Sequence, residues 1–112
     1  MKGSDAEQTA LSYLLGQGLE LVERNYRCRF GEIDLVMSEG KTLVFVEVRM
    51  RASDVFGGAA ASITVAKQEK LLRAARHYLS GLRHEPCCRF DAVLMTGIDN
   101  PRIEWIRNAF GE

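Results

Sequence analysis

The sequence predicts an α/β fold in which helices flank a central mixed β-sheet. Five apolar runs rich in β-branched and aromatic residues are predicted strands. Two longer segments repeat apolar residues at a spacing of three and four, which predicts helices. The expected order is a helix, three strands, a second helix and two strands. At 112 residues, with no internal repeat, the chain fits a single domain over residues 1–112.

A first helix is predicted near the N-terminus, because apolar residues recur there at helical spacing: Ala6, Ala10, Leu11, Leu14 and Leu15. Ser4 is a candidate N-cap, and Glu7 lies three residues further on, which is the spacing of a capping box. Gly18 suits the left-handed turn that often ends a helix. Leu19–Arg24 is then the first predicted strand.

The second and third predicted strands are Ile33–Met37 and Leu43–Arg49, and a short turn separates them. Gly40 in that turn suits a positive φ angle, which tight hairpin turns require. We therefore expect these two strands to form a hairpin. Pairing the hairpin with the first strand gives a three-stranded core.

The second half of the chain contains one helix and two strands. The helix is predicted over Thr64–Leu79 and ends at Gly81. Arg89–Met95 and Arg102–Ile106 are the fourth and fifth predicted strands. Within the last strand, Trp105 alternates with another apolar side chain, which predicts packing against the sheet rather than base stacking.

Asp34 and Glu47 place carboxylates inside strands that are otherwise apolar. The hairpin can bring them opposite each other, with Cβ atoms about 5 Å apart. Carboxylates that close repel unless one is protonated or a cation neutralises the pair, and Mg²⁺ prefers such oxygen ligands. The alternative is an ordinary ion pair between Glu47 and Arg49, with Asp34 capping a turn.

Two segments, Asn25–Val36 and Leu43–Arg51, closely resemble the YraN-like family of bacterial proteins. They include Gly-Glu-Ile-Asp-Leu and Phe-Val-Glu-Val, and the resemblance extends over most of the chain. That family is similar to a branch of the PD-(D/E)XK nuclease superfamily, near the archaeal Holliday junction resolvases. The resemblance implies a restriction-endonuclease-like fold and metal-dependent hydrolysis of phosphodiester bonds in DNA, including branched or flapped DNA.

The same resemblance implies roles for individual residues. Asp34 matches the first metal-binding acid and Glu47 the second, while the carbonyl of Val48 would be a third ligand of Mg²⁺ or Mn²⁺. Glu7 matches a catalytic acid on the first helix. Arg49 stands where the superfamily has lysine. Arginine stays charged and cannot act as a general base, but it can hold a phosphate or stabilise transition-state charge.

Basic residues gather in two parts of a chain whose formal net charge is zero. A zero net charge disfavours indiscriminate nucleic-acid binding, but local clusters can still bind phosphate. We expect nucleic acid, DNA by the resemblance, to contact Arg24, Arg27, Arg29, Arg51, Lys67 and Lys70. A solvated helix face is an equally good interpretation of the second cluster. The connection Arg51–Ala61 follows the third strand, where it either contacts substrate or serves as an ordinary linker.

Several classes of protein are disfavoured. No stretch approaches the roughly 20 apolar residues of a membrane span, and the acidic N-terminus lacks the apolar core of a secretion signal. We therefore expect a cytoplasmic protein without a membrane partner. The three cysteines, Cys28, Cys87 and Cys88, are odd in number and lack Cys-x-x-Cys spacing, which argues against a disulfide framework or a zinc site.

Two other functions stay open. Arg49 in place of lysine favours an inactive nucleic-acid-binding module with a nuclease fold. The zero net charge favours a protein–protein adaptor. A homodimer would suit a DNA junction with two-fold symmetry, although no apolar stripe in the sequence indicates an interface.

Overall fold

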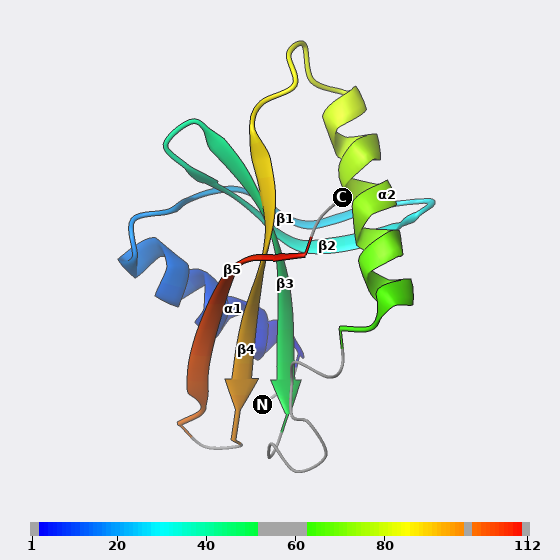
Figure 1. Cartoon of the computed structure of the whole chain (residues 1–112). Helices are drawn as coiled ribbons and strands as arrows, with labels where there is room; N and C mark the ends of the chain where they lie inside the picture. Colours follow the sequence, from blue (N-terminus) through cyan, green and yellow to red (C-terminus); the bar gives the residue numbers. More distant parts are fainter. Residues whose placement is uncertain (1–2, 52–62, 98–99, 111–112) are drawn as a thin grey trace.

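Five strands and two helices form the structure, a computed structural model that describes residues 3–51, 63–97 and 100–110 (Figure 1). In chain order they are α1 (Gly3–Gly16), β1 (Glu20–Cys28), β2 (Gly31–Glu39), β3 (Thr42–Arg51), α2 (Val65–Ser80), β4 (Cys88–Thr96) and β5 (Arg102–Phe110). The predicted α/β fold and the order of its elements are confirmed.

The strands form one mixed sheet in the order β1-β2-β3-β4-β5. β1, β2 and β3 are successive antiparallel neighbours, β3 and β4 pair in parallel, and β4 and β5 pair antiparallel. A parallel pair needs a long crossover, and the segment that carries α2 supplies it. The expected three-stranded core of β1, β2 and β3 is present.

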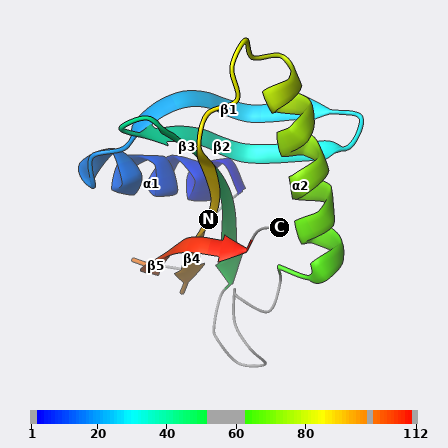
Figure 2. The ribbon, with the colours of Figure 1, turned by 45° about the horizontal axis from the view of Figure 1, so that its top comes forward.

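The two helices cover opposite faces of this sheet, as the alternation of side chains along β3 shows. Val44, Val46 and Val48 pack in a core cluster with α1. Leu43 and Phe45 pack in a second cluster with α2. Because successive strand residues point to opposite faces, the helices lie on different sides of the sheet (Figure 2). Within the described residues, neither helix has the length and hydrophobicity that a membrane crossing needs.

β1 extends to Cys28, beyond the predicted strand end at Arg24. Cys28 pairs with Gly31, so only Arg29 and Phe30 form the tip of the β1–β2 hairpin. This extension was missed because β1 is an edge strand whose side chains are mostly exposed. Its sequence therefore lacks the apolar alternation that marks a half-buried strand.

The helix ends match the predictions in α2 and differ in α1. Thr64 caps α2, since its Oγ1 accepts a hydrogen bond from the Lys67 backbone N–H at 3.3 Å, and Gly81 follows its last residue. α1 begins at Gly3, so Ser4 lies inside the helix and the predicted capping role is wrong. Of the connection Arg51–Ala61, only its first residue belongs to the described part of the chain.

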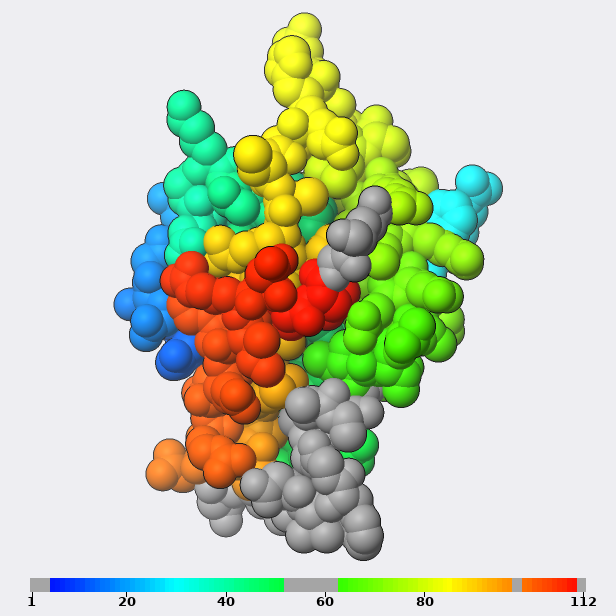
Figure 3. All heavy atoms as spheres, viewed as in Figure 1, coloured from blue at the N-terminus to red at the C-terminus, as the bar shows by residue number. Residues whose placement is uncertain are grey.

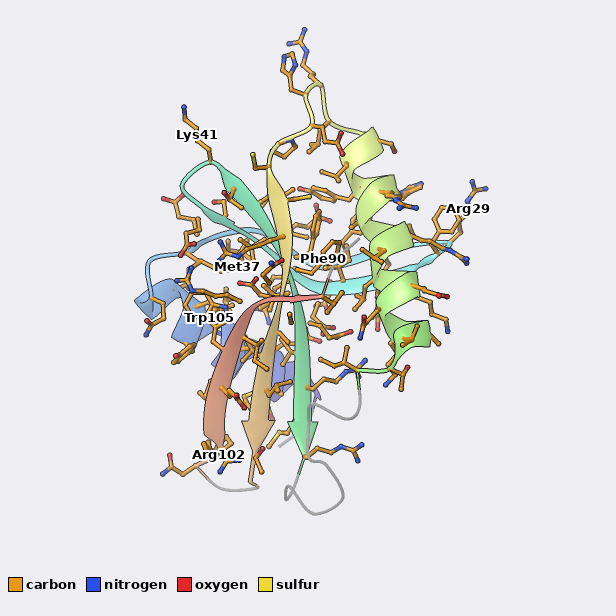
Figure 4. The ribbon with its side chains drawn as sticks, viewed as in Figure 1. Arg29, Met37, Lys41, Phe90, Arg102 and Trp105 are labelled. Carbon is orange, nitrogen blue, oxygen red and sulfur yellow. The ribbon has the colours of Figure 1, made fainter. Side chains whose placement is uncertain are left out.

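A fully buried carboxylate fastens β5 to β4. Asp91 accepts hydrogen bonds of 2.9 Å from Arg89 Nε, from the Trp105 indole and from the Asn108 backbone N–H. A buried charge needs such partners, because leaving it unpaired costs several kcal/mol. Trp105 packs against the α1 cluster, so its predicted packing role is confirmed (Figure 4).

Candidate active site

β2 and β3 separate next to the two carboxylates identified in the sequence. Leu35 and Val46 are the last residues that pair in this ladder. Asp34 and Glu47 are the next residue on each strand, and the same register sets them opposite each other. The hairpin register expected from the sequence is therefore present, and the carboxylates stand where the ladder opens.

A backbone group of β3 ties Asp34 to this opening. Beyond the last ladder pair, the Val48 N–H has no β2 carbonyl to meet, and Asp34 Oδ2 accepts its hydrogen bond at 2.8 Å. The N–H and C=O of one strand residue point toward the same neighbouring strand. The Val48 carbonyl, which the resemblance implies as a metal ligand, is therefore directed toward the side of β3 where Asp34 lies.

Glu47 is buried, with 8% of its surface exposed. Burial, followed by a hydrogen bond and charge repulsion from Asp34, raises the pKa of Glu47 to about 9. A hydrogen bond between two carboxyl groups requires a proton on one of them, so the pair shares a proton when no metal is bound. At neutral pH the metal-free pair therefore holds one negative charge rather than two.

Two cations border the pair without reversing this shift. Arg49 Nη2 lies 3.3 Å from Glu47 Oε2, and Lys67 in the first turn of α2 also lowers the pKa of Glu47. The Nε of Arg49 is buried and has no hydrogen-bond partner among the described residues. The Nε–H of Arg49 is thus a hydrogen-bond donor at the site for which Glu47 does not serve as the acceptor.

Glu7 reaches the same region from α1. Burial and then the Asp34 charge raise the pKa of Glu7, while a hydrogen bond from Asn25 and the charge of Arg24 lower it. The predicted acid of the first helix therefore interacts electrostatically with Asp34. Instead of reaching back to Ser4, its carboxylate bonds Asn25 in β1.

Sequence reasoning missed Asn25. Its neighbours in β1, Arg24 and Tyr26, pair with Leu35 and Ile33, so Asn25 stands across the β1–β2 ladder from Asp34. Its φ angle is +52°, a left-handed conformation that is unusual inside a strand. The available signal was the residue type, because Asn tolerates this conformation better than most side chains do.

The six predicted nucleic-acid contacts do not gather in one place. Lys67 lies near Glu47, and Arg24 lies near Glu7 while donating to Gln8 Oε1 at 2.9 Å. The other four lie away from these two acids. Arg29 stacks on Phe30 and Lys70 lies against Gly31, so these two meet at the hairpin tip. Arg27 pairs with Glu32 at 3.2 Å, and Arg51 is exposed at the end of β3.

The donor set fits a hard divalent cation. In the described part of the chain, no three acidic, histidine or cysteine side chains form a metal-ligating cluster. Mg²⁺ commonly uses only one or two carboxylates and completes its shell with water and substrate phosphate. Asp34, Glu47 and the Val48 carbonyl supply that pattern, and a cation there would replace the proton that the carboxyl pair shares.

Known proteins are similar to this chain over nearly all of its residues. Residues 6–95 match the pattern of Uncharacterised protein family UPF0102. The chain belongs to this family. A UPF0102 protein of Nitrosomonas europaea is 67% identical over 99% of this chain and 94% of its own length. One of Nitrosospira multiformis is 64% identical over 98% and 92%, and one of Psychromonas ingrahamii is 53% identical over 99% and 90%.

Proposed function

We propose that this UPF0102 protein is a Mg²⁺-dependent endonuclease that hydrolyses phosphodiester bonds in DNA, including branched or flapped DNA. The observation that carries the proposal is the carboxyl pair of Asp34 and Glu47, at the point where β2 and β3 part. A structural carboxylate is usually neutralised by a nearby cation, but here burial and crowding with Asp34 raise the pKa of Glu47 even though Arg49 lies 3.3 Å away. The surrounding segments resemble the YraN-like family, and the similarity of that family to PD-(D/E)XK nucleases supports the same proposal.

Each residue of the site has a chemical task in this proposal. Asp34, Glu47 and the Val48 carbonyl would hold Mg²⁺, which supplies a water of lowered pKa and neutralises phosphate charge. Arg49 would bind a non-bridging oxygen of the scissile phosphate through the part of its guanidinium group that remains exposed, and would stabilise the developing charge. Glu7 would orient a water from the side of α1. Arg49 remains cationic, so no proton is removed by this side chain.

Diffraction from crystals soaked in Mn²⁺ tests the metal site directly. We expect an anomalous peak between the Asp34 and Glu47 carboxyl groups. Asp34→Asn is the matched variant, because its amide oxygen still accepts from Val48 N–H while the negative charge is lost. The peak should be absent in that variant. A wild-type crystal without a peak at this position contradicts the proposed ligand set.

Cleavage assays test the reaction itself. The wild-type protein is incubated with junction, flap, single-stranded and duplex DNA in Mg²⁺, in Mn²⁺ and in EDTA. We expect hydrolysis only with a divalent cation, and at least a hundred-fold loss of rate in Asp34→Asn, of the order seen when a key electrostatic group is removed. Failure of the wild-type protein to cleave any of these DNAs with either metal overturns the proposed activity.

Arg49 favours one alternative, a nucleic-acid-binding module that has the nuclease architecture without turnover. A lysine at this position can lose its proton when buried, whereas arginine cannot. DNA binding that is sensitive to salt but unchanged by EDTA and by Asp34→Asn, with no cleavage, would favour this second function. Arg49→Lys adds a sharper test, because a gain of cleavage in that variant would show that arginine alone silences the site.

The proposal also places the protein in the cytoplasm. No disulfide joins the three cysteines of the described chain, Cys28, Cys87 and Cys88, and the last two are exposed. Exposed thiols persist in a reducing compartment and tend to oxidise outside it. Fractionation of cells that produce the chain at its natural level checks this part, and recovery outside the cytoplasm would contradict it.

A further inference from the structure

The tip of the β1–β2 hairpin exposes an aromatic ring beneath a guanidinium group. Phe30 retains 36% of its surface in solvent, and the Arg29 guanidinium lies 4.8 Å from its ring centroid. The hairpin projects past the outer side of α2, where Arg29 points away from the protein (Figures 3 and 4). An exposed aromatic ring and an arginine plane are the two side-chain surfaces on which nucleic-acid bases stack.

A series of ring contacts holds this tip to the core. Phe45 in the α2 cluster contacts Tyr78 with ring centroids 5.8 Å apart, and Tyr78 contacts Tyr26 at 5.1 Å. The Tyr26 hydroxyl and His77 Nδ1 form a 2.6 Å hydrogen bond, and the His77 ring lies 5.8 Å from that of Phe30. Phe30 is therefore fixed in place before any ligand arrives, which lowers the entropy cost of binding.

Positive charge lies beside the ring, on α2. A Cβ atom on Gly31 would lie 3.7 Å from Lys70 Cβ, so the hairpin end rests directly on the helix. Lys70 and Arg73 are both exposed, and α2 carries four lysine or arginine residues against the single acid Glu69. A nucleic-acid strand that crosses α2 could place its phosphates near the basic side chains and an unpaired base on the exposed ring.

We propose that Phe30 and Arg29 form a stacking platform for an unpaired nucleotide, with the adjoining backbone lying along Lys70 and Arg73. Phe30 precedes Asp34 by four residues of the same hairpin, a distance of about 13 Å at strand rise. A bound strand can therefore span from the platform to the carboxyl pair. The inference rests on the proposed function and narrows its substrate to DNA with unpaired nucleotides beside the scissile bond.

Binding in EDTA separates this inference from catalysis. The probe is a flap DNA with the fluorescent base 2-aminopurine at successive positions of its single-stranded arm, compared with a fully paired duplex. We expect quenching at one arm position on binding of the full-length protein. Phe30→Ala and Phe30→Leu should each weaken flap binding roughly ten-fold and abolish the quenching, because both remove the aromatic face. Phe30→Trp should restore both signals.

Two controls make the assay specific. Leu82→Ala shortens another exposed apolar side chain, 40% exposed, and should leave flap affinity unchanged. Arg73→Gln should weaken flap and duplex binding by the same factor and lower the salt dependence of binding by about one phosphate contact. Circular dichroism of each variant verifies that the fold is retained.

The outcomes separate the two proposals. Flap affinity and quenching that persist in both Phe30→Ala and Phe30→Leu overturn the stacking platform, even if the wild-type protein cleaves DNA. Loss of affinity that is equal on flap and duplex overturns it as well. Conversely, selective loss with rescue by Phe30→Trp supports the platform even if no metal supports cleavage. In that case only the proposal of DNA hydrolysis is overturned.

Discussion

The backbone N–H of Val48 donates a 2.8 Å hydrogen bond to Asp34 Oδ2. The β2–β3 ladder ends at Leu35 and Val46. The Asp34 side chain therefore accepts the hydrogen bond that a backbone carbonyl of β2 would accept if the ladder continued. Asp34 thus joins β2 to β3 at the place where the backbone ladder ends and where its carboxylate lies beside Glu47. The same carboxylate stabilises the strand pair and, in the proposed function, binds the metal ion. Different substitutions of Asp34 separate these two roles.

Asp34→Asn and Asp34→Ala should differ in stability and agree in activity. The amide oxygen of asparagine still accepts from Val48, so we expect a change below about 1 kcal/mol in the free energy of unfolding. Alanine leaves that N–H unpaired, which costs about 1–3 kcal/mol. Both variants should lose Mg²⁺-dependent cleavage. Urea denaturation and cleavage assays check this, and equal stability of the two variants would contradict the structural role.

The stability of the metal-free protein should depend on Glu47 and pH. Above its ordinary pKa of 4.5 the unfolded chain releases the Glu47 proton, whereas the folded protein keeps it until about pH 9. Raising the pH through this window therefore favours unfolding, because the folded protein holds a proton that the unfolded chain has released. Relative to Glu47→Gln, the wild-type protein in EDTA should lose stability steadily between pH 5 and pH 9.

Urea denaturation followed by the fluorescence of Trp105, the single tryptophan, measures this difference. Glu7 also has a raised pKa, but it is present in both proteins and largely cancels. Saturating Mg²⁺ should flatten the pH dependence of the wild-type protein by displacing the proton, and should leave Glu47→Gln unchanged. Parallel curves for the two proteins in EDTA would show that Glu47 ionises normally.

Asn25 should tolerate glycine better than alanine. Both substitutions remove the hydrogen bond to Glu7, but only glycine accepts a φ of +52° without strain. We expect Asn25→Ala to be less stable than Asn25→Gly by about 1 kcal/mol. Glu23, in the same strand with an ordinary φ, is the matched control, and there alanine should be the more stable. The same order at both positions would rule out backbone strain at Asn25.

Asp91→Ala should be among the most damaging substitutions outside the candidate site. The Arg89 guanidinium, the Trp105 indole and the Asn108 N–H then lose their buried acceptor. This loss should lower the free energy of unfolding by about 3–5 kcal/mol. Glu39→Gln, at the more exposed end of the same network, should cost much less than Asp91→Ala, because solvent screens an exposed ion pair. Equilibrium unfolding in urea compares them, and similar losses would mean that burial of Asp91 is not decisive.

The sequence predicted those features that depend on neighbours in the chain. Gly40 and the alternation of β2 and β3 determine a hairpin register, and that register alone brings Asp34 opposite Glu47. Asn25 was not predicted, because its role depends on a contact between β1 and α1. The separation of the predicted basic residues was not predicted either, because Arg27 lies in the part of β1 beyond the predicted strand end and Arg29 lies in the turn that follows.

The two-residue turn at Gly40 also bears on the order in which the chain folds. Closing so short a loop loses little entropy, whereas the β3–β4 pair must wait for the long crossover through α2. We therefore expect Asp34 and Glu47 to meet early in folding, while water still surrounds them. The slower half of the molecule then assembles around two acids that are already side by side.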